Sequence, residues 1–517
     1  MEGRRRALII GAGLGGIATA GRLARAGMQV TVLEKNAQPG GRCDQLVVDG
    51  HRFDTGPTLL LMPDVFRRTY AALGGRMEDL LDLHRIDPTY RLHSNDGLRL
   101  DLTSDLSNMA EQLESLEPGS SAGLMAFLAE GRRHYQVALD RFVTRQFKGW
   151  FDYFSPANLP LLIRLKALVK HYDYTGRFFK SDFLRAAFSF QNMYLGLSPY
   201  RAPATFSLLQ TTELVDGVWY PTGGMYAVVQ TLVRLAETNG ARFHYNAPVQ
   251  RIEVEGGRAV AVRLADGQRL EADVIIANAD LPYVYDELLQ DRRASRELDR
   301  KAFTSSAIMF YWGVGRVFPQ LRHHNVFLAG DYQASFRQIF DDLDLPASPS
   351  FYINAPTRTD PSAAPAGQDS LMVLVPAGHL DEEHPQEWGT LKERARQSVF
   401  SGLAKIGIHD LARHIKFEVA YTPQDWARLY NLKKGAAFGL SHNFSQVGYL
   451  RPQNRHAKVD NLYFVGASTH PGTGLPMVLI SAELTSRRVL SEQLPAAERW
   501  AAEKRASLVL PGDPSAV

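Results

Sequence analysis

The chain has 517 residues, which is too long for one compact core and predicts two or three domains. Hydrophobic residues make up 45% and charged residues 22%, a composition that excludes an intrinsically disordered chain. Lys and Arg number 58 and Asp and Glu 55, so the net charge of +3 gives no reason to expect a nucleic-acid partner. The single cysteine, Cys43, excludes an intramolecular disulfide and a multi-cysteine metal site, and it suits a reducing cytoplasm.

Apolar runs in the sequence are short. Only four apolar residues, 7–10, separate the basic start of the chain from the first glycines, so we expect a buried strand there and no signal peptide. The best candidate for a membrane span, residues 307–314, is too short to cross a bilayer. Any contact with a membrane is therefore expected to be peripheral.

The first forty residues have the pattern of one βαβ unit. Residues 7–10 and 28–33 read as strands, and residues 17–26 repeat apolar side chains at helical spacing. Between the first strand and the helix, residues 11–16 match G-x-G-x-x-G, which predicts cofactor contacts from Gly11, Ala12, Gly13, Gly15 and Gly16. The helix start offers N–H groups and a positive dipole end to a diphosphate.

Acidic and glycine residues after this unit indicate which dinucleotide is bound. Glu34 ends the second strand, where a carboxylate accepts hydrogen bonds from a ribose hydroxyl and repels the 2′-phosphate of NADP. A glycine pair with a cation and then a second tight turn follow, and both favour FAD over NAD. The predicted contacts in this stretch are Glu34, Lys35, Gly41, Arg42, Gly56, Pro57 and Thr58.

The final strand, 462–466, also leads into a glycine-rich turn and a helix. Gly466, Gly472 and Gly474 place backbone N–H groups at this helix start, and Pro476 is favoured there because its missing N–H costs no hydrogen bond. Such a start stabilises negative charge on a reduced flavin. His470 in the same turn is either a general base or a brace that holds the turn by hydrogen bonds, and the brace is favoured. No His, Asp or Glu cluster has metal-ligand spacing, so we expect no metal.

A stretch from Phe147 to Phe190 is rich in aromatic, aliphatic and basic residues and is expected to be helical. As a single helix, 161–172 would place leucines on one side and Lys166 and Lys170 on the other. The segment either faces lipid or lines a tunnel entrance, with cations at phosphate head groups, or it is a domain core with a solvated face. The pattern alone favours the core, whereas a substrate that dissolves only in membranes would favour the first interpretation.

The quoted motifs together resemble the flavin amine oxidase and carotenoid desaturase superfamily. Residues 461–477 resemble, more narrowly, the bacterial and fungal phytoene desaturases, and the stretches 220–225, 277–280 and 306–312 also match. The resemblance runs from about residue 6 to residue 490. It implies an α/β fold with an FAD-binding Rossmann-like domain, a mixed α+β substrate domain and a helical region for membrane and substrate access.

The expected division alternates between these parts. The FAD-binding domain takes residues 1–70, 201–280 and 455–492, and the substrate domain takes 71–145 and 281–454. The helical insertion takes 146–200, and 493–517 form a tail.

The resemblance also implies a reaction and the roles of several residues. FAD would take a hydride from one CH₂ group of a linear polyene such as phytoene while a proton leaves the adjacent carbon, and oxygen or a quinone would reoxidise the flavin. Gly474, Leu475, Pro476 and Met477 would lie beside the isoalloxazine ring, and the backbone of Val249 would meet the adenine.

Two other functions remain open from the sequence. A carotenoid oxygenase or isomerase could use the same scaffold. A non-catalytic prenyl-binding protein, as in the Rab GDP-dissociation inhibitors, shares the architecture, but the intact glycines and Glu34 argue against it because such a protein needs no flavin contacts.

Overall fold

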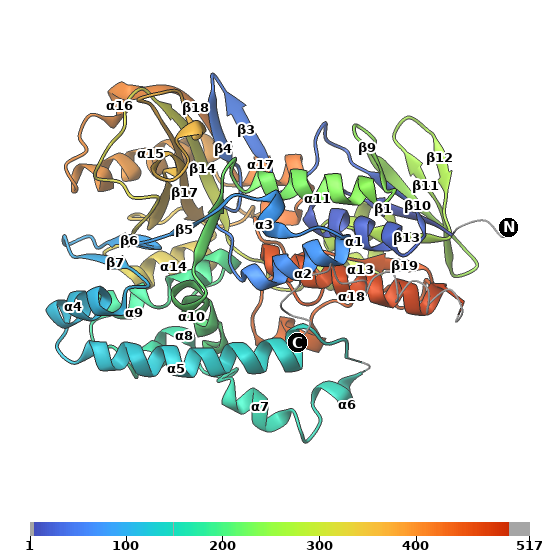
Figure 1. Ribbon diagram of the computed structural model, residues 1–517, viewed down its shortest axis with the longest axis horizontal. Coiled ribbons are helices and arrows are strands. Elements are labelled where there is room, and N and C mark those ends of the chain that lie inside the picture. The colour runs from blue at the N-terminus through green and yellow to red at the C-terminus, as the bar shows by residue number, and fades with distance from the viewer. Residues whose placement is uncertain (1–4, 148, 496–517) are drawn as a thin grey trace.

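The computed structural model describes residues 5–147 and 149–495, which form a parallel sheet, a mixed sheet and a layer of helices (Figure 1). In Figure 1 the parallel sheet lies on the right, the mixed sheet at the upper left and the helical layer along the lower edge. The predicted α/β fold class is confirmed. Of the predicted tail, residues 496–517 lie outside the described residues, and the predicted division into segments stays a prediction.

The parallel sheet joins three distant parts of the chain. Its order is β19 (Leu462–Phe464), β13 (Val274–Ala277), β1 (Arg6–Ile10), β2 (Gln29–Leu33) and β9 (Arg242–His244). The strands expected at 7–10 and 28–33 are therefore confirmed, with β1 at the centre. The last strand, expected over 462–466, is also present but ends at Phe464.

Both faces of this sheet are covered. Ala7 and Ile9 of β1 pack with helices α1 (Leu14–Arg25), α11 (Tyr226–Thr238) and α18 (Leu475–Gln493). Leu8 and Ile10, which point the other way, pack with the antiparallel strands β10 (Val249–Glu255), β11 (Arg258–Leu264) and β12 (Arg269–Glu271). Burial on both faces explains why residues 7–10 of β1 are an uninterrupted apolar run.

The mixed sheet has seven strands. Their order is β18 (Ile415–Tyr421), β14 (Ser306–Val314), β17 (Asp369–Ala377), β16 (Phe351–Asn354), β15 (His324–Phe327), β6 (Tyr90–His93) and β7 (Arg99–Leu102). Helix α15 (Trp388–Ala404) covers one face, where Phe310 and Trp312 of β14 are buried. Ala307 and Met309, on the opposite face of β14, line the central cavity.

Two further strand pairs and several short helices complete the region around the sheets. The pairs are β3 (Gln45–Val48) with β4 (His51–Asp54) and β5 (Leu83–Ile86) with β8 (Val218–Pro221). The helices are α2 (Pro63–Leu73), α3 (Met77–Leu80), α12 (Leu281–Tyr283), α13 (Arg292–Asp299), α14 (Tyr332–Phe340), α16 (Leu411–His414) and α17 (Pro423–Tyr430).

The helical layer lies between residues 106 and 215. It contains α4 (Leu106–Leu116), α5 (Ser120–Ala138), α6 (Trp150–Tyr153), α7 (Leu159–Arg164), α8 (His171–Thr175), α9 (Asp182–Ala187), α10 (Ser207–Val215) and a 3₁₀ helix, η2 (Phe190–Leu195). Within the described part of the chain, none of the helices combines the length and hydrophobicity that a membrane span requires.

The single helix expected over 161–172 is wrong. α7 ends at Arg164, and Lys166 has a φ of 54°, in the left-handed region. The turn buries Leu165, which is 3% exposed, and leaves Leu168 80% exposed, although a helix would have put both leucines on one face. Burial of Leu165 against Phe142 and Tyr153 outweighs the local helical pattern.

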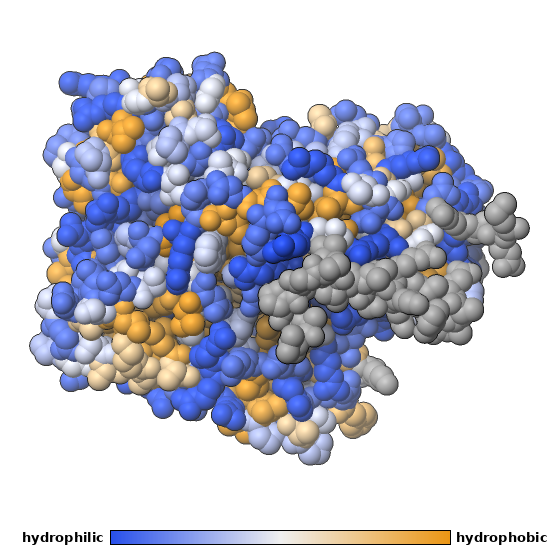
Figure 2. Space-filling view, viewed as in Figure 1, coloured by the Kyte–Doolittle hydropathy of each residue, from blue (hydrophilic) through white to orange (hydrophobic). Residues whose placement is uncertain are grey.

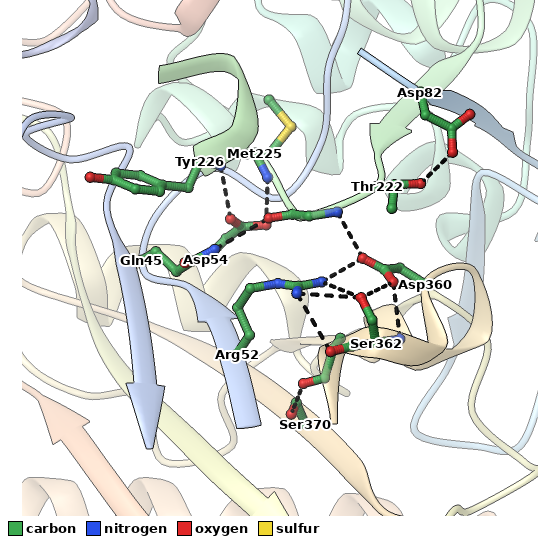
Figure 3. Close-up of polar contacts among 12 residues, drawn as sticks. Gln45, Arg52, Asp54, Asp82, Thr222, Met225, Tyr226, Asp360, Ser362 and Ser370 are labelled. Atoms are coloured by element: carbon green, nitrogen blue, oxygen red, sulfur yellow. Dashed lines mark hydrogen bonds and ion pairs between the residues drawn. The ribbon is translucent and has the colours of Figure 1, made fainter. Parts of the chain in front are cut away.

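A buried polar cluster fixes the loop that follows β4 (Figure 3). The Asp54 carboxylate accepts the backbone N–H groups of Met225, at 3.0 Å, and Tyr226, at 3.3 Å, at the start of α11. Asp360 pairs with Arg52 and accepts the Gly223 N–H at 2.9 Å. Burial raises the pKa of Asp54 to about 6 in spite of its hydrogen bonds. The cluster ties β4 and the α11 start to the connection between β16 and β17, where the loop after β4 reaches the cavity.

Candidate cofactor and substrate site

One continuous cavity of about 620 Å³ extends from the edge of the parallel sheet into the helical layer. Ile10 and Leu33, the last residues of β1 and β2, lie at one end of it. Every site residue predicted from the sequence lines this cavity except Ala12 and Gly16. The first strands of the chain, the turn before α18 and the helical layer thus meet around one space.

The first glycine turn is built around Asn278, which follows β13. Its Nδ2 donates to the Gly11 carbonyl at 3.1 Å. A Cβ on Gly13 would lie 2.9 Å from Asn278 Nδ2, and one on Gly15 would lie 2.7 Å from Asn278 Oδ1. A Cβ on Gly16 would lie 2.2 Å from the Gly11 carbonyl oxygen, so this glycine serves helix packing.

Two helix N-termini face the cavity without a side-chain cap. Gly13 precedes α1 and Gly474 precedes α18, and neither helix start has a side-chain hydrogen bond. A Cβ on Gly474, whose φ is +103°, would meet nothing within 4 Å. Both helix starts therefore present N–H groups and positive dipole ends to a ligand, which fits the diphosphate and the negatively charged ring edge of a reduced flavin dinucleotide.

Glu34 lies on the cavity wall with its carboxylate already oriented. Its Oε2 accepts the Ala12 N–H at 2.7 Å and its Oε1 accepts the Asn36 N–H at 2.9 Å. Burial raises its pKa. Because each carboxylate oxygen has a second lone pair, the group can still accept from ribose hydroxyls. Ala12 thus acts through its backbone, behind the cavity wall.

The two predicted cations are held by other parts of the chain. Lys35 Nζ donates to Asn431 Oδ1 at 2.7 Å and to the Arg428 carbonyl at 3.2 Å. Arg42 donates to the Ala437 carbonyl at 2.9 Å. Burial lowers the pKa of Arg42, and the nearby Asp280 carboxylate offsets part of this lowering. α17 and the residues after it thus keep both charges beside the cavity.

The turn before α18 is braced by a buried arginine that sequence reasoning missed. Arg451 is 1% exposed and donates to five backbone carbonyls, those of Leu440, Ser441, Gln446, Ala467 and Thr469. His442, beside it, accepts the Thr473 N–H through Nε2 at 3.0 Å. An Arg-Pro pair at 451–452 was the available signal, but it does not identify these partners.

His470 has the geometry of a brace. Its Nε2 donates to the Arg145 carbonyl at 3.0 Å, and its ring packs edge-on against Phe147, with centroids 6.3 Å apart. Burial lowers its pKa to about 4, so the ring is neutral at physiological pH. The contact links the glycine turn to the segment between α5 and α6.

The far end of the cavity is apolar. Side chains reach it from the helical layer and from the free face of the mixed sheet, among them Phe142, Tyr153, Leu162, Leu165, Phe206, Leu209, Met309 and Leu374. Among the described residues no group of three or more His, Cys, Asp or Glu side chains is placed to hold a metal ion. The cavity therefore combines a polar end suited to a dinucleotide with an arm suited to a hydrocarbon.

Comparisons with known proteins agree with this geometry. Residues 14–490 match the model of the flavin-containing amine oxidoreductase family. The chain is 49% identical over 490 residues to a zeta-carotene-forming phytoene desaturase of Myxococcus xanthus, with 94% of each chain covered. It is 42% identical to a phytoene desaturase of Phycomyces blakesleeanus, covering 94% of this chain and 85% of that one.

A solved oxidoreductase of Methanosarcina mazei has the same fold, with a TM-score of 0.63 at 17% identity, over 93% of this chain and 99% of that one. The family match begins at Leu14, within the first glycine turn, and includes the whole of the second turn and all of the chain between the two. The chain belongs to the flavin-containing amine oxidoreductase family.

Proposed function

We propose that this protein is an FAD-dependent desaturase that converts a linear carotenoid precursor such as phytoene into a more conjugated polyene. The observation that carries the proposal is the continuous cavity, which joins two uncapped helix N-termini to a long apolar arm. The names of the relatives from Myxococcus and Phycomyces support the same substrate class.

FAD is the cofactor, in agreement with the family. We propose that Gly11 to Gly15 and the start of α1 hold its diphosphate, and that Glu34 binds the adenine ribose. Val249, on the cavity wall, lies where its backbone can meet the adenine. Gly466 and residues 474–477 would lie at the isoalloxazine end.

FAD supplies a hydride acceptor, and the protein has to do the rest. The apolar arm binds the hydrocarbon, excludes water and holds the allylic carbons in one orientation, which lowers the entropic part of the barrier. The uncapped α18 start would stabilise negative charge on a bound flavin ring. His470, neutral and fixed to Arg145, positions the turn and does not take up a proton at neutral pH.

The helical layer gives the substrate a route from a membrane. Apolar side chains are exposed on and around α6 and α7, namely Trp150, Phe151, Leu159, Ile163, Leu168 and Val169. Figure 2 shows apolar side chains on the lower edge of the molecule, where Figure 1 places α6 and α7. Arg164 and Lys170 are exposed beside them, while Leu162 and Leu165 of the same segment line the cavity. This supports peripheral docking on an anionic bilayer.

The other activities find less support. The curated relatives from Myxococcus and Phycomyces are named for desaturation and not for oxygenation or isomerisation. A non-catalytic prenyl-binding protein would not need the uncapped helix starts that face the cavity. Oxygen or a quinone remains the proposed electron acceptor.

The test is anaerobic mixing of the FAD-loaded protein with phytoene in liposomes. We expect bleaching of the flavin band in a single turnover and, after air is admitted, coloured polyenes separable by chromatography. Flavin that stays oxidised with phytoene and with partly desaturated polyenes would contradict the proposal.

A further inference from the structure

Glu213, on α10, differs from every other buried acidic side chain that the structure describes. The other five are Glu34, Asp54, Asp280, Asp360 and Asp369, and each has a backbone N–H donor, an arginine partner or both. Glu213 is fully buried, and its one hydrogen bond comes from the side-chain amide of Gln191, at 3.0 Å. Its Oε1 has no hydrogen-bond partner.

Two tyrosines connect Glu213 to the cavity. Tyr194 of η2 and Tyr90 of β6 line the cavity, and their ring centroids are 6.2 Å apart. The Glu213 carboxylate acts electrostatically on both hydroxyls. The Tyr194 hydroxyl is within reach of the carboxyl but makes no well-formed hydrogen bond in this state. Tyr194 is thus a side chain that both lines the cavity and interacts with the Glu213 carboxyl.

Other titratable groups near the cavity are less suited to accept a proton. Burial lowers the pKa of His470 to about 4 and keeps the pKa values of His324 and His442 well below their ordinary value. Burial raises the pKa of Glu213 to about 8, near the pH at which a general base is most effective. Besides Gln191, only Tyr194 shifts that pKa among the described residues, and it lowers it.

We propose, on the basis of the proposed function, that Glu213 receives through Tyr194 the proton that desaturation releases from the substrate. As hydride leaves one carbon for FAD, the proton on the adjacent carbon passes to the Tyr194 oxygen. The Tyr194 hydroxyl proton passes to the Glu213 carboxylate, and the electron pair of the broken C–H bond becomes the new C=C bond. FAD is the oxidant, and Glu213 ends the step protonated.

The experiment compares wild-type holoenzyme with Glu213→Gln, Glu213→Asp and Tyr194→Phe, with Glu237→Gln, an exposed glutamate of α11, as control. In wild type the rate of anaerobic flavin reduction by phytoene should rise with pH up to about 8 as Glu213 loses its proton. Glu213→Gln and Tyr194→Phe should slow it by about 10- to 100-fold and remove this rise. Glu213→Asp should restore part of the rate, and Glu237→Gln should match wild type.

An infrared titration of the holoenzyme without substrate provides a second measurement. A protonated-carboxyl band that disappears as pH rises past about 8 in wild type, and is missing in Glu213→Gln, would support the proposal. A Glu213→Gln enzyme with the wild-type rate and pH profile, or no such band in wild type, would overturn it. A third outcome separates the two proposals. If no polyene reduces the flavin of wild type while the carboxyl band titrates as expected, the proposed desaturase function is wrong, although Glu213 still takes up a proton near pH 8.

Discussion

At the residue scale, the glycines of the first turn are required by a neighbour within the protein as well as by a dinucleotide. Asn278 fills the space beside Gly11, Gly13 and Gly15 and holds the Gly11 carbonyl. The backbone of Gly13, at φ −70° and ψ 168°, is one that any residue adopts. The restriction at this position is therefore steric.

Gly13→Ala should weaken FAD binding by at least about 10-fold, because its Cβ would displace Asn278 and misplace the N–H groups of the turn. Flavin retained per protein after extensive dialysis measures this. Gly389→Ala, in α15 with nothing within 4 Å of the added Cβ, is the control and should retain flavin as wild type does. Full occupancy in Gly13→Ala would show that the turn does not bind the diphosphate.

Burial of Glu213 should also make stability depend on pH. Its pKa is raised from 4.5 to about 8 in the folded protein, so over this interval the folded state holds a proton that the unfolded state has lost. Stability from this group is thus fully present below about pH 4.5 and is lost as pH rises through about 8. The glutamine of Glu213→Gln has no titrating proton. The melting temperature of this variant minus that of wild type should therefore increase as pH rises from about 4.5 to about 8. A constant difference would mean that Glu213 is solvated.

At the element scale, the sequence was enough to predict those strands and helices that depend on short local motifs. The glycine motif and apolar runs were enough for β1, β2 and the helix after each glycine turn. The pattern over 161–172 failed because burial of Leu165 requires a break at Lys166. Asn278 was missed as a site residue because its partner Gly11 is 267 residues away, so that no local pattern reveals the contact.

The turn before α18 gives a prediction at this scale. Arg451→Leu would leave four buried carbonyls, those of Leu440, Gln446, Ala467 and Thr469, without the arginine donor, while the Ser441 carbonyl keeps the Gln446 side-chain amide. Each unsatisfied group costs about 1–3 kcal/mol. We expect a melting temperature lower by several degrees, measured by thermal denaturation, and loss of bound flavin, measured by absorbance. Arg455→Leu, which removes a partly exposed arginine four residues away, should have a much smaller effect. Similar losses in both variants would contradict the bracing role.

At the scale of the whole molecule, the cavity and the apolar surface belong to the same segment of chain. Leu162 and Leu165 line the cavity, while Ile163 and Leu168, between and beside them in sequence, are 74% and 80% exposed. The left-handed turn at Lys166 separates the buried Leu165 from the exposed Leu168. A polyene leaving a bilayer at this surface would therefore reach the cavity along residues of one short segment.

Replacing Ile163 and Leu168 with Asp should reduce co-sedimentation with liposomes of any charge, because the exposed apolar contacts are lost. Exchanging Lys166 and Lys170 for Glu should weaken binding to anionic liposomes only, since each cation near such a surface contributes about 1 kcal/mol. Val47→Asp, which changes an apolar side chain of β3 that is 61% exposed, is the matched control and should bind as wild type does. All variants should keep their flavin, because none of the replaced side chains lines the cavity. If the Ile163/Leu168 and Lys166/Lys170 variants both bind liposomes as wild type does, α6 and α7 form a solvated surface. The substrate would then enter the cavity by another route.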